Sequence, residues 1–373
     1  MRTALKDARR IVIKVGSSTL THANGRLNLY RIECLVKQMA DLVNQGKEIL
    51  FVSSGATAAG LPALGFKEKP RDLAVKQAAA SVGQGLLLHM YEKLFREYGH
   101  TVGQVLLTRE DTVKRSHYVS LKNTLMTLLE LGVIPVINEN DVVAIEEFKI
   151  GDNDTLSATV AGLVEADALI ILSDIDGLYT DNPQTNPEAT LISEVKSVTP
   201  DIYAIAGGAG SSRGTGGMLT KIQAAHIAVN SGVHMVIASG EERDSIRHVL
   251  AGEVIGTHFL PADTRTHMKK RWMAFGTRLK GVLRVDEGCR RALMSDGASL
   301  LAVGITEVEG EFEFGDTVSI NYNGREIGRG ISNYASDEIE RIRGCHSEDI
   351  ADRLGIDTAY DEVIHRDNLV VLR

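Results

Sequence analysis

The 373-residue chain has only three cysteines and no long apolar run. Cys34, Cys289 and Cys345 lie far apart and form no CxxC motif, which argues against a disulfide scaffold and against a zinc site. Between the basic N-terminus and Lys14 there is only a short apolar run at 11–13, which is too short for a secretory signal, and no segment approaches a membrane span. We therefore expect a cytoplasmic protein that does not enter a membrane.

Motifs of several common enzyme classes are also missing. The chain has no GxxxxGK[ST] and no intact GxGxxG after a strand, so neither the P-loop nor the Rossmann dinucleotide site is present. It has no HExxH and no cluster of histidines with metal-ligand spacing. The triplet HRD at 365–367 imitates a protein-kinase catalytic loop, but there is no DFG motif. The sequence fits none of these classes.

The charge of the chain is acidic and unevenly spread. Lysine and arginine number 41 against 49 aspartates and glutamates, a net charge of −8, which disfavours a protein that coats nucleic acid or an anionic membrane. From residue 275 onward there are 12 basic and 19 acidic residues, so this part carries almost all of the excess acid. A hydrophobic content of 43% over this length is enough for two domains with cores of their own.

The first 260 residues alternate between short apolar runs and segments with helical spacing. The runs are nearly continuous in valine, isoleucine and leucine, which is typical of strands buried on both faces of a parallel sheet. The apolar residues of 32–43 recur at helical spacing, and Gly46 follows as a C-terminal glycine. The pattern predicts a layered α/β fold with a mostly parallel sheet. The runs lie at 11–15, 49–52, 102–107, 133–137, 168–172 and 233–238.

Beyond the basic stretch at 269–271 the pattern becomes short and period-two. Alternating residues at 312–322 lead into Asn323 and Gly324, and Ile327 resumes the alternation, which predicts a β-hairpin with a type I′ turn. The last residues either close this small β-rich domain or make a subunit contact. The boundaries that we expect are 1–260 for the first domain, 261–279 for a linker, 280–358 for the small domain and 359–373 for a tail.

Polar and glycine-rich segments follow four of the apolar runs directly. Ligands of open α/β sheets bind beyond the carboxyl ends of the strands, so these segments predict one composite site. A solvated turn would explain any one of them alone, but not four together. The segments are KVGSS at 14–18, SSGA at 53–56, NEND at 138–141 and SDIDG at 173–177.

Two lysines in this pattern indicate an anion site. Lys14 lies inside an apolar strand, where an ammonium group needs a partner, and the nearby Gly16 lets a ligand approach the backbone; the alternative is a structural ion pair. Lys221 follows the glycine-rich stretch 207–217 at the start of a helical pattern, where a cation is disfavoured unless a polyphosphate binds; the alternative is a flexible linker. With the segment GDND at 151–154, the lysines predict phosphoryl transfer. A carboxylate acceptor would be ionised already and need no general base.

These residues resemble the amino-acid kinase family, and residues from about 280 to 358 resemble a PUA domain. The runs INENDVVA and GDNDTLSA are the most specific part of the resemblance. It implies a three-layer α/β/α sandwich with a mostly parallel central sheet, the amino-acid kinase fold, plus a small β-rich PUA-like barrel domain. The matching stretches are VIKVGSSTL at 12–20, VSSGATAAG at 52–60, VGQVLLTRED at 102–111, PVINENDVVA at 135–144, KIGDNDTLSA at 149–158, DGLYTDNP at 176–183 and GTGGMLTK at 214–221.

The resemblance is closer to the branch of the family that phosphorylates the γ-carboxylate of L-glutamate with ATP. It implies γ-glutamyl phosphate as product, the first step of proline biosynthesis, with proline as a feedback inhibitor. Mg²⁺ is implied as the counter-ion of ATP, with no dedicated metal site on the protein. A homo-oligomer, dimer or tetramer, and association with the glutamyl phosphate reductase that consumes the product are implied in the same way.

The roles of single residues come from the same resemblance. Lys14 and Lys221 would bind the β- and γ-phosphates as catalytic residues, and Asp154 would hold the two lysines in place. Glutamate would be bound by Ser54, Asp141 and Asn153. ATP would be held by Lys14, Ser173, Asp174, Thr215, Gly216, Gly217, Met218, Leu219, Thr220 and Lys221. The family more often has Thr-Asp where this chain has Ser-Asp at 173–174, and serine keeps the hydroxyl.

Two other functions stay open at this point. A sister kinase that acts on another small carboxylate would keep the same phosphate site. A PUA protein that binds RNA would need a basic surface, which the acidic C-terminal part does not offer. We expect its clustered arginines to pair with neighbouring acidic residues; they are Arg325, Arg329, Arg341 and Arg343.

Overall fold

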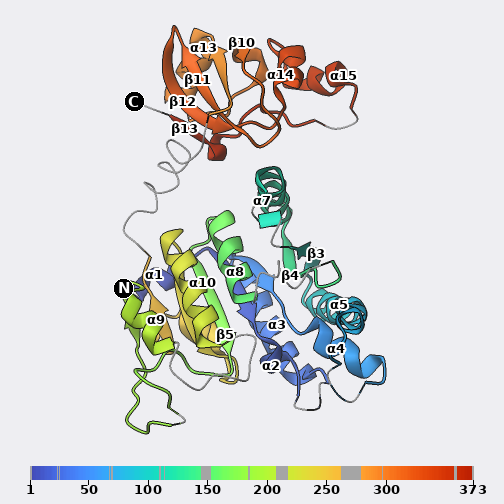
Figure 1. Ribbon diagram of the computed structural model, residues 1–373, viewed down its shortest axis with the longest axis vertical. Helices are drawn as coiled ribbons and strands as arrows, with labels where there is room; N and C mark the ends of the chain where they lie inside the picture. The colour runs from blue at the N-terminus through green and yellow to red at the C-terminus, as the bar shows by residue number, and fades with distance from the viewer. Residues whose placement is uncertain are drawn as a thin grey trace. The chain divides into compact units, whose positions relative to one another are not determined.

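The chain forms two units in the computed structural model, Met1–Arg265 and Thr266–Arg373 (Figure 1). The structure describes residues 2–22, 24, 26–66, 68, 70–108, 111–112, 114–143, 153–183, 185–206, 217–261, 279–295, 297–356 and 359–371.

The first unit is built on an eight-stranded sheet with the order β3-β4-β2-β1-β5-β7-β8-β6. All six predicted apolar runs are strands of this sheet, and the pairs from β3 to β7 are parallel, so the prediction is confirmed. The edge strand β6 and its neighbour β8 were not predicted because two or three residues are too few to show a period. The strands are β1 (Arg10–Val15), β2 (Glu48–Val52), β3 (Thr101–Leu107), β4 (Val133–Glu139), β5 (Ala168–Ser173), β6 (Glu194–Val195), β7 (His234–Ser239) and β8 (Thr257–Phe259).

Helices cover both faces of this sheet and complete a three-layer α/β/α sandwich, as the resemblance implied. The helices are α1 (Thr3–Lys6), α2 (Ser17–Leu20), α3 (Leu29–Asn44), α4 (Ala56–Ala63), α5 (Leu73–Glu97), α7 (Arg115–Glu130), α8 (Asn153–Leu163), α9 (Pro200–Ala206), α10 (Met218–Asn230) and α11 (Ser245–Leu250). Alternate residues of β1 face opposite layers: Ile11 and Ile13 pack with α3, α4, α5 and α11, whereas Val12 packs with α7, α8 and α10. Figure 1 shows α8 and α10 side by side over the sheet.

Local signals set both ends of α3, and the sequence predicted the C-terminal one. The Asn28 side chain accepts a hydrogen bond from the Arg31 backbone N–H at 3.2 Å and caps the N-terminus. Gly46, at φ +84°, lies two residues beyond the last helical residue, in the left-handed conformation that favours glycine at a helix end. The helix therefore begins and ends where its own sequence says it should.

Helices α4 and α5 touch backbone to backbone at two glycines. A Cβ atom on Gly83 would lie 1.7 Å from the carbonyl oxygen of Ala56, and one on Gly60 would lie 1.8 Å from that of Ala79. No side chain fits at either position without moving the helices apart. Since α4 begins directly after the segment that follows β2, this contact fixes one of the predicted site segments to α5.

We expect Gly83→Ala to lower the free energy of unfolding by about 1–3 kcal/mol, because the added methyl group forces the two helices apart. Gly85→Ala is the matched control in the same helix. Its Cβ would meet nothing within 4 Å, so the better helix propensity of alanine should raise stability by roughly 0.5–1 kcal/mol. Urea unfolding of both variants measures the difference. Shifts of the same sign would show that the close contact does not fix the helices.

The second unit contains a five-stranded mixed sheet with the order β10-β9-β11-β12-β13. Its strands are β9 (Gly281–Val285), β10 (Ile305–Glu309), β11 (Thr317–Tyr322), β12 (Arg325–Ile331) and β13 (Leu369–Val371). Asn323 and Gly324 join β11 to β12 with φ values of 48° and 76°, so the predicted type I′ hairpin is confirmed. Its helices are α13 (Glu287–Ser295), α14 (Ser336–Ile342) and α15 (Ile350–Leu354), with short 3₁₀ turns at Ala302–Gly304, Ser347–Asp349 and Arg366–Asn368.

The residues after 358 belong to the core and sheet of this second unit. Val363 and Ile364 are fully buried among its apolar side chains, and β13 pairs antiparallel with β12. Of the two alternatives for the tail, closing the small domain is the one that the structure contains. None of the helices in the described ranges has the length and apolar composition needed to cross a membrane.

Three of the four clustered arginines of this unit are engaged by their neighbours. Arg329 pairs with Glu326 at 2.7 Å and Arg343 pairs with Glu340 at 2.7 Å, as expected from the sequence. Arg341 instead donates to two backbone carbonyl oxygens at the end of α15. These three guanidinium groups therefore form no open basic patch of the kind that RNA phosphates would need.

Candidate active site

The predicted site segments meet at one edge of the first sheet. β2, β1 and β5 are adjacent and parallel, and β4 pairs with β2, so their carboxyl ends point the same way. Gly16 donates its backbone N–H to the Leu172 carbonyl oxygen at 3.3 Å, and Ser53 donates its backbone N–H to the Ile137 carbonyl oxygen at 2.9 Å. These contacts continue the strand pairing into the polar segments and bring them together.

Lys14, Asp154 and Lys221 form one buried cluster. The Nζ atom of Lys14 lies 2.6 Å from Oδ1 of Asp154, and the Nζ atom of Lys221 lies 3.1 Å from Oδ2. Asp154 is 0% exposed, and the two lysines are 3% and 5% exposed. One carboxylate from the start of α8 therefore holds two ammonium groups from β1 and α10.

The electrostatics of this cluster favour the ionised carboxylate. Burial alone would raise the pKa of Asp154, but the ammonium groups of Lys14 and Lys221 outweigh burial and hold the pKa below its ordinary value. The cluster has two positive charges for one negative charge, so it retains a net positive charge in a place with little water. Such a place attracts a polyphosphate and stabilises charge that develops on a transferred phosphoryl group.

Two helix N-termini contribute to the same spot. Asp154 lies in the first turn of α8, where a carboxylate is favoured by the helix dipole. Lys221 is the fourth residue of α10, where a cation is disfavoured. The sequence suggested that a bound phosphate compensates this unfavourable charge. The structure shows a compensating anion within the protein, because the carboxylate of Asp154 faces Lys221. Thr220 supports this arrangement by donating its hydroxyl to Oδ2 of Asp154 at 3.2 Å.

Asn153, the residue before Asp154, organises a second, polar cluster. Its Nδ2 atom lies 2.9 Å from each of three oxygens: the Ser53 carbonyl, the Ser54 hydroxyl and Oδ1 of Asn138. Its own Oδ1 atom is buried and has no hydrogen-bond partner among the described residues. A buried acceptor without a donor is costly, so this oxygen marks a place where a ligand donor would fit.

Sequence reasoning missed two members of this cluster as site residues. The carbonyl of Ser53 and the amide of Asn138 both contact Asn153, although only Ser54 was assigned to the substrate. The signal was present, because both residues belong to polar segments that follow strands. Nothing in the sequence shows, however, which atoms of those segments turn toward the start of α8.

The other predicted residues lie at the same edge with fewer contacts. The hydroxyl of Ser173 donates to Oδ1 of Asp174 at 3.0 Å, and the Ser173 carbonyl accepts from the Gly240 N–H at 2.6 Å. Asp174 is exposed. Asp141 lies half-buried in the turn after β4, two residues beyond the last residue of that strand. The roles of these three side chains remain predictions.

The segment before α10 is only partly described. Thr215 and Gly216 lie outside the described residues. Gly217 is the residue that precedes the first turn of α10, Met218 is half-buried, and Leu219 is 43% exposed. Of the predicted ATP loop, Thr220 and Lys221 are the residues that contact Asp154.

The described part of the chain contains no cluster of side chains that could bind a metal ion. No three histidine, cysteine, aspartate or glutamate side chains there come close enough to hold an ion together.

Comparison with known proteins shows the family to which this chain belongs. A sequence profile of the amino acid kinase family matches residues 9–239, and a PUA domain profile matches residues 281–354. The chain belongs to the amino acid kinase family. The buried lysine–aspartate–lysine cluster at the sheet edge lies within the matched region, and the second unit contains the PUA match.

The curated relatives make the resemblance more specific. A glutamate 5-kinase of Moorella thermoacetica is 54% identical over 372 residues, which is 100% of this chain and 98% of that protein. Glutamate 5-kinases of Caldanaerobacter subterraneus and Deinococcus radiodurans are 55% and 50% identical, each over 97% of this chain and over 98% and 100% of their own lengths. A solved UMP kinase of Bacillus anthracis aligns over 68% of this chain and 96% of its own with a TM-score of 0.48 and 15% identity, so the assignment stands on the sequence matches.

Proposed function

We propose that this chain transfers the γ-phosphoryl group of ATP to the γ-carboxylate of L-glutamate, in line with its similarity to proteins that are named glutamate 5-kinase. The observation that carries the proposal is the adjacency of Asn153 and Asp154 at the start of α8. Asp154 forms ion pairs with the two lysines that would bind phosphates. Asn153 forms hydrogen bonds with the polar atoms that would bind an amino acid. One helix start therefore joins a phosphate site to an acceptor site.

The chemistry needs positioning and positive charge more than proton transfer. A γ-carboxylate oxygen attacks the γ-phosphorus of ATP, the bond from that phosphorus to the β,γ-bridging oxygen breaks, and ADP leaves with the electron pair. Lys14 and Lys221 would stabilise the charge on the phosphoryl oxygens during this step. The carboxylate is already ionised at neutral pH, so no general base is required.

Substrate recognition would come from the polar cluster. The Oδ1 atom of Asn153, which has no partner among the described residues, and the carboxylate of Asp141 suit the α-ammonium group of an amino acid, and the Ser54 hydroxyl suits a carboxylate. The first N–H groups of α4, which begins after Gly55, are further donors for a carboxylate. ATP would lie against Ser173, Asp174 and the 215–221 segment. Mg²⁺ would arrive bound to the ATP phosphates and neutralise them.

A trapping experiment tests this function. Hydroxylamine attacks the carbonyl carbon of an acyl phosphate and releases phosphate, leaving a hydroxamate that can be measured. We expect ATP-dependent hydroxamate with L-glutamate and little with N-acetylglutamate or aspartate. Asp141→Ala should damage the use of glutamate and leave ATP binding nearly intact. Signal with another acid would replace the substrate and keep the mechanism, whereas no signal with any acid from folded protein would contradict the proposal.

The resemblance extends the proposal to regulation and partners. As the first enzyme of proline biosynthesis, acting in the cytoplasm, the protein would be inhibited by proline, would assemble as a dimer or tetramer, and would pass its labile product to a reductase. Adding millimolar proline to the trapping assay over a range of glutamate concentrations tests the regulation. Unchanged rates throughout that range would exclude feedback inhibition.

A further inference from the structure

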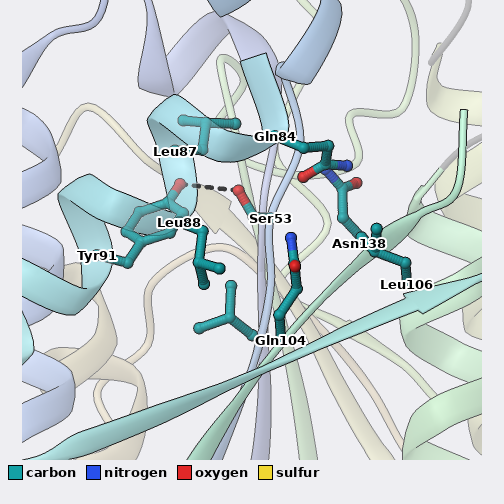
Figure 2. A pocket seen from close by; sticks show the side chains of 9 residues that line it. Ser53, Gln84, Leu87, Leu88, Tyr91, Gln104, Leu106 and Asn138 are labelled. Atoms are coloured by element: carbon teal, nitrogen blue, oxygen red, sulfur yellow. Dashed lines mark hydrogen bonds between the residues drawn. The ribbon is translucent and has the colours of Figure 1, made fainter. Parts of the chain in front are cut away.

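One face of α5 lies over the ends of β2 and β4, next to the polar cluster of Asn153. Gln84 and Tyr91 are seven residues apart on this helix and therefore lie on the same face. The Gln84 amide donates from Nε2 to the Glu139 carbonyl oxygen at 3.2 Å, and the Tyr91 hydroxyl lies 2.8 Å from the Ser53 hydroxyl. Figure 2 shows both side chains beside a small cavity, with Ser53 between the helix and the sheet.

The direction of the hydrogen bonds follows from the surroundings of Tyr91. The ring is 1% exposed and meets Phe51 edge to face, with ring centroids 4.9 Å apart. Burial raises the pKa of Tyr91, so its hydroxyl keeps the proton. Ser53 Oγ also lies 3.4 Å from the Ser54 carbonyl oxygen, which can only accept. Tyr91 therefore donates to Ser53, and Ser53 donates to Ser54.

This chain of hydroxyls ends at the peptide bond between Ser54 and Gly55. Gly55 has φ +86° and comes directly before the first residue of α4. A peptide next to a glycine can flip at low cost, because glycine accepts both signs of φ. A bond to the Ser54 carbonyl oxygen opposes that flip. It thereby sets the direction of the Gly55 N–H, which points opposite to that carbonyl across the trans peptide.

The same segment supplies atoms to the proposed substrate site. The Ser54 hydroxyl and the Ser53 carbonyl both lie 2.9 Å from Nδ2 of Asn153. A flip of the 54–55 peptide would reverse the direction of the Gly55 N–H, and so change the hydrogen-bond donors that this segment presents beside the Ser54 hydroxyl. The orientation of this peptide therefore decides whether the polar cluster of Asn153 and the N-terminus of α4 can contact the same ligand.

We propose that Tyr91 is a positioning residue for the amino-acid substrate: acting through Ser53, it fixes the Ser54–Gly55 peptide and thereby the direction of the Gly55 N–H at the start of α4, beside the Ser54 hydroxyl. Tyr91 itself touches neither substrate in this scheme. The inference rests on the proposed glutamate kinase activity and adds the residue that holds its acceptor pocket in shape.

The test compares glutamate with ATP in steady-state kinetics of the full chain. Tyr91→Phe removes only the hydroxyl and keeps the contact of the ring with Phe51. We expect the KM for glutamate to rise about three- to tenfold, as for the loss of one buried hydrogen bond, with kcat and the KM for ATP within about twofold of wild type. Ser53→Ala should have the same effect, and the double variant should be no worse than either single variant, because both remove one chain of bonds.

Two further variants separate positioning from general stability. Ser53→Thr keeps a hydroxyl, and the cavity beside it has room for about one water-sized group, so the KM for glutamate should recover relative to Ser53→Ala. Tyr98→Phe removes a hydroxyl at the C-terminal end of the same helix, where the ring packs against the same core, and should leave both KM values unchanged.

Three results would count against the inference. An unchanged KM for glutamate in Tyr91→Phe would overturn it, provided that the wild type phosphorylates glutamate. An equal change in kcat and in both KM values, following a lower melting temperature, would mean a structural role only. A wild type inactive on every acid would overturn both this inference and the proposed function.

Discussion

Replacing Lys221 with methionine should lower kcat at least 10²- to 10³-fold while the protein stays folded. The Nζ atom of Lys221 lies 3.1 Å from Asp154 and, with Lys14, supplies the positive charge of the cluster. Methionine keeps most of the volume and removes the charge that would stabilise the phosphoryl group in the transition state. Preorganised groups of this kind contribute about 3–4 kcal/mol each to the barrier. The hydroxamate assay at saturating glutamate and ATP measures the loss.

Lys122→Met is the matched control for this variant. Lys122 is also 5% exposed and pairs with an acid, Glu165, at 3.0 Å, but it lies in α7 away from the strand ends that form the site. Its replacement should cost stability and leave the kcat of the folded enzyme close to wild type. If Lys122→Met and Lys221→Met lose the same activity, burial of a lysine matters to the fold, and Lys221 has no special part in the reaction.

Asp154→Asn should both destabilise the protein and abolish most of its activity. The asparagine would leave two buried ammonium groups without their counter-charge, and breaking a buried ion pair in this way costs about 3–5 kcal/mol. Activity should fall because the lysines would turn away from each other toward water. Urea unfolding measures the first effect, and initial rates at a temperature where the variant is folded measure the second.

The pH dependence of stability gives the same prediction a second readout. Since the pKa of Asp154 is lowered in the folded chain, its contribution is complete above the ordinary aspartate pKa of about 3.9 and is lost as the pH falls further. Asp154→Asn should remove this component of the acid loss. Glu92→Gln, which breaks an exposed pair with Arg96 in α5, is the control and should change stability by less than about 1 kcal/mol. Equal effects of the two substitutions would contradict a special role for the buried cluster.

The strands and the hairpin were accessible from the sequence because each is a local pattern. The run at 168–172 became β5 with one more residue, and the dipeptide Asn323-Gly324 gave the turn that its φ values require. The edge strand β6 was not accessible, because two residues carry no period and its position depends on pairing with β8. The sequence pattern therefore predicts an element well when the element is long enough to show a period. It predicts an element poorly when pairing with another strand decides where the element forms.

The features of the site also fall into those that are local in the sequence and those that depend on tertiary contacts. By itself the sequence determined that serines and other polar residues follow the strands of a parallel sheet, that one lysine lies near a strand end, and that the other lysine lies at a helix start. These are local properties of the chain. Only the tertiary structure decided that Asp154 faces a lysine 67 residues away, that Asn153 turns to Ser53 and Asn138, and that Tyr91 reaches Ser53 from α5. Those pairings depend on distances between elements that are remote in the chain, and such distances leave no periodic trace in the order of the residues.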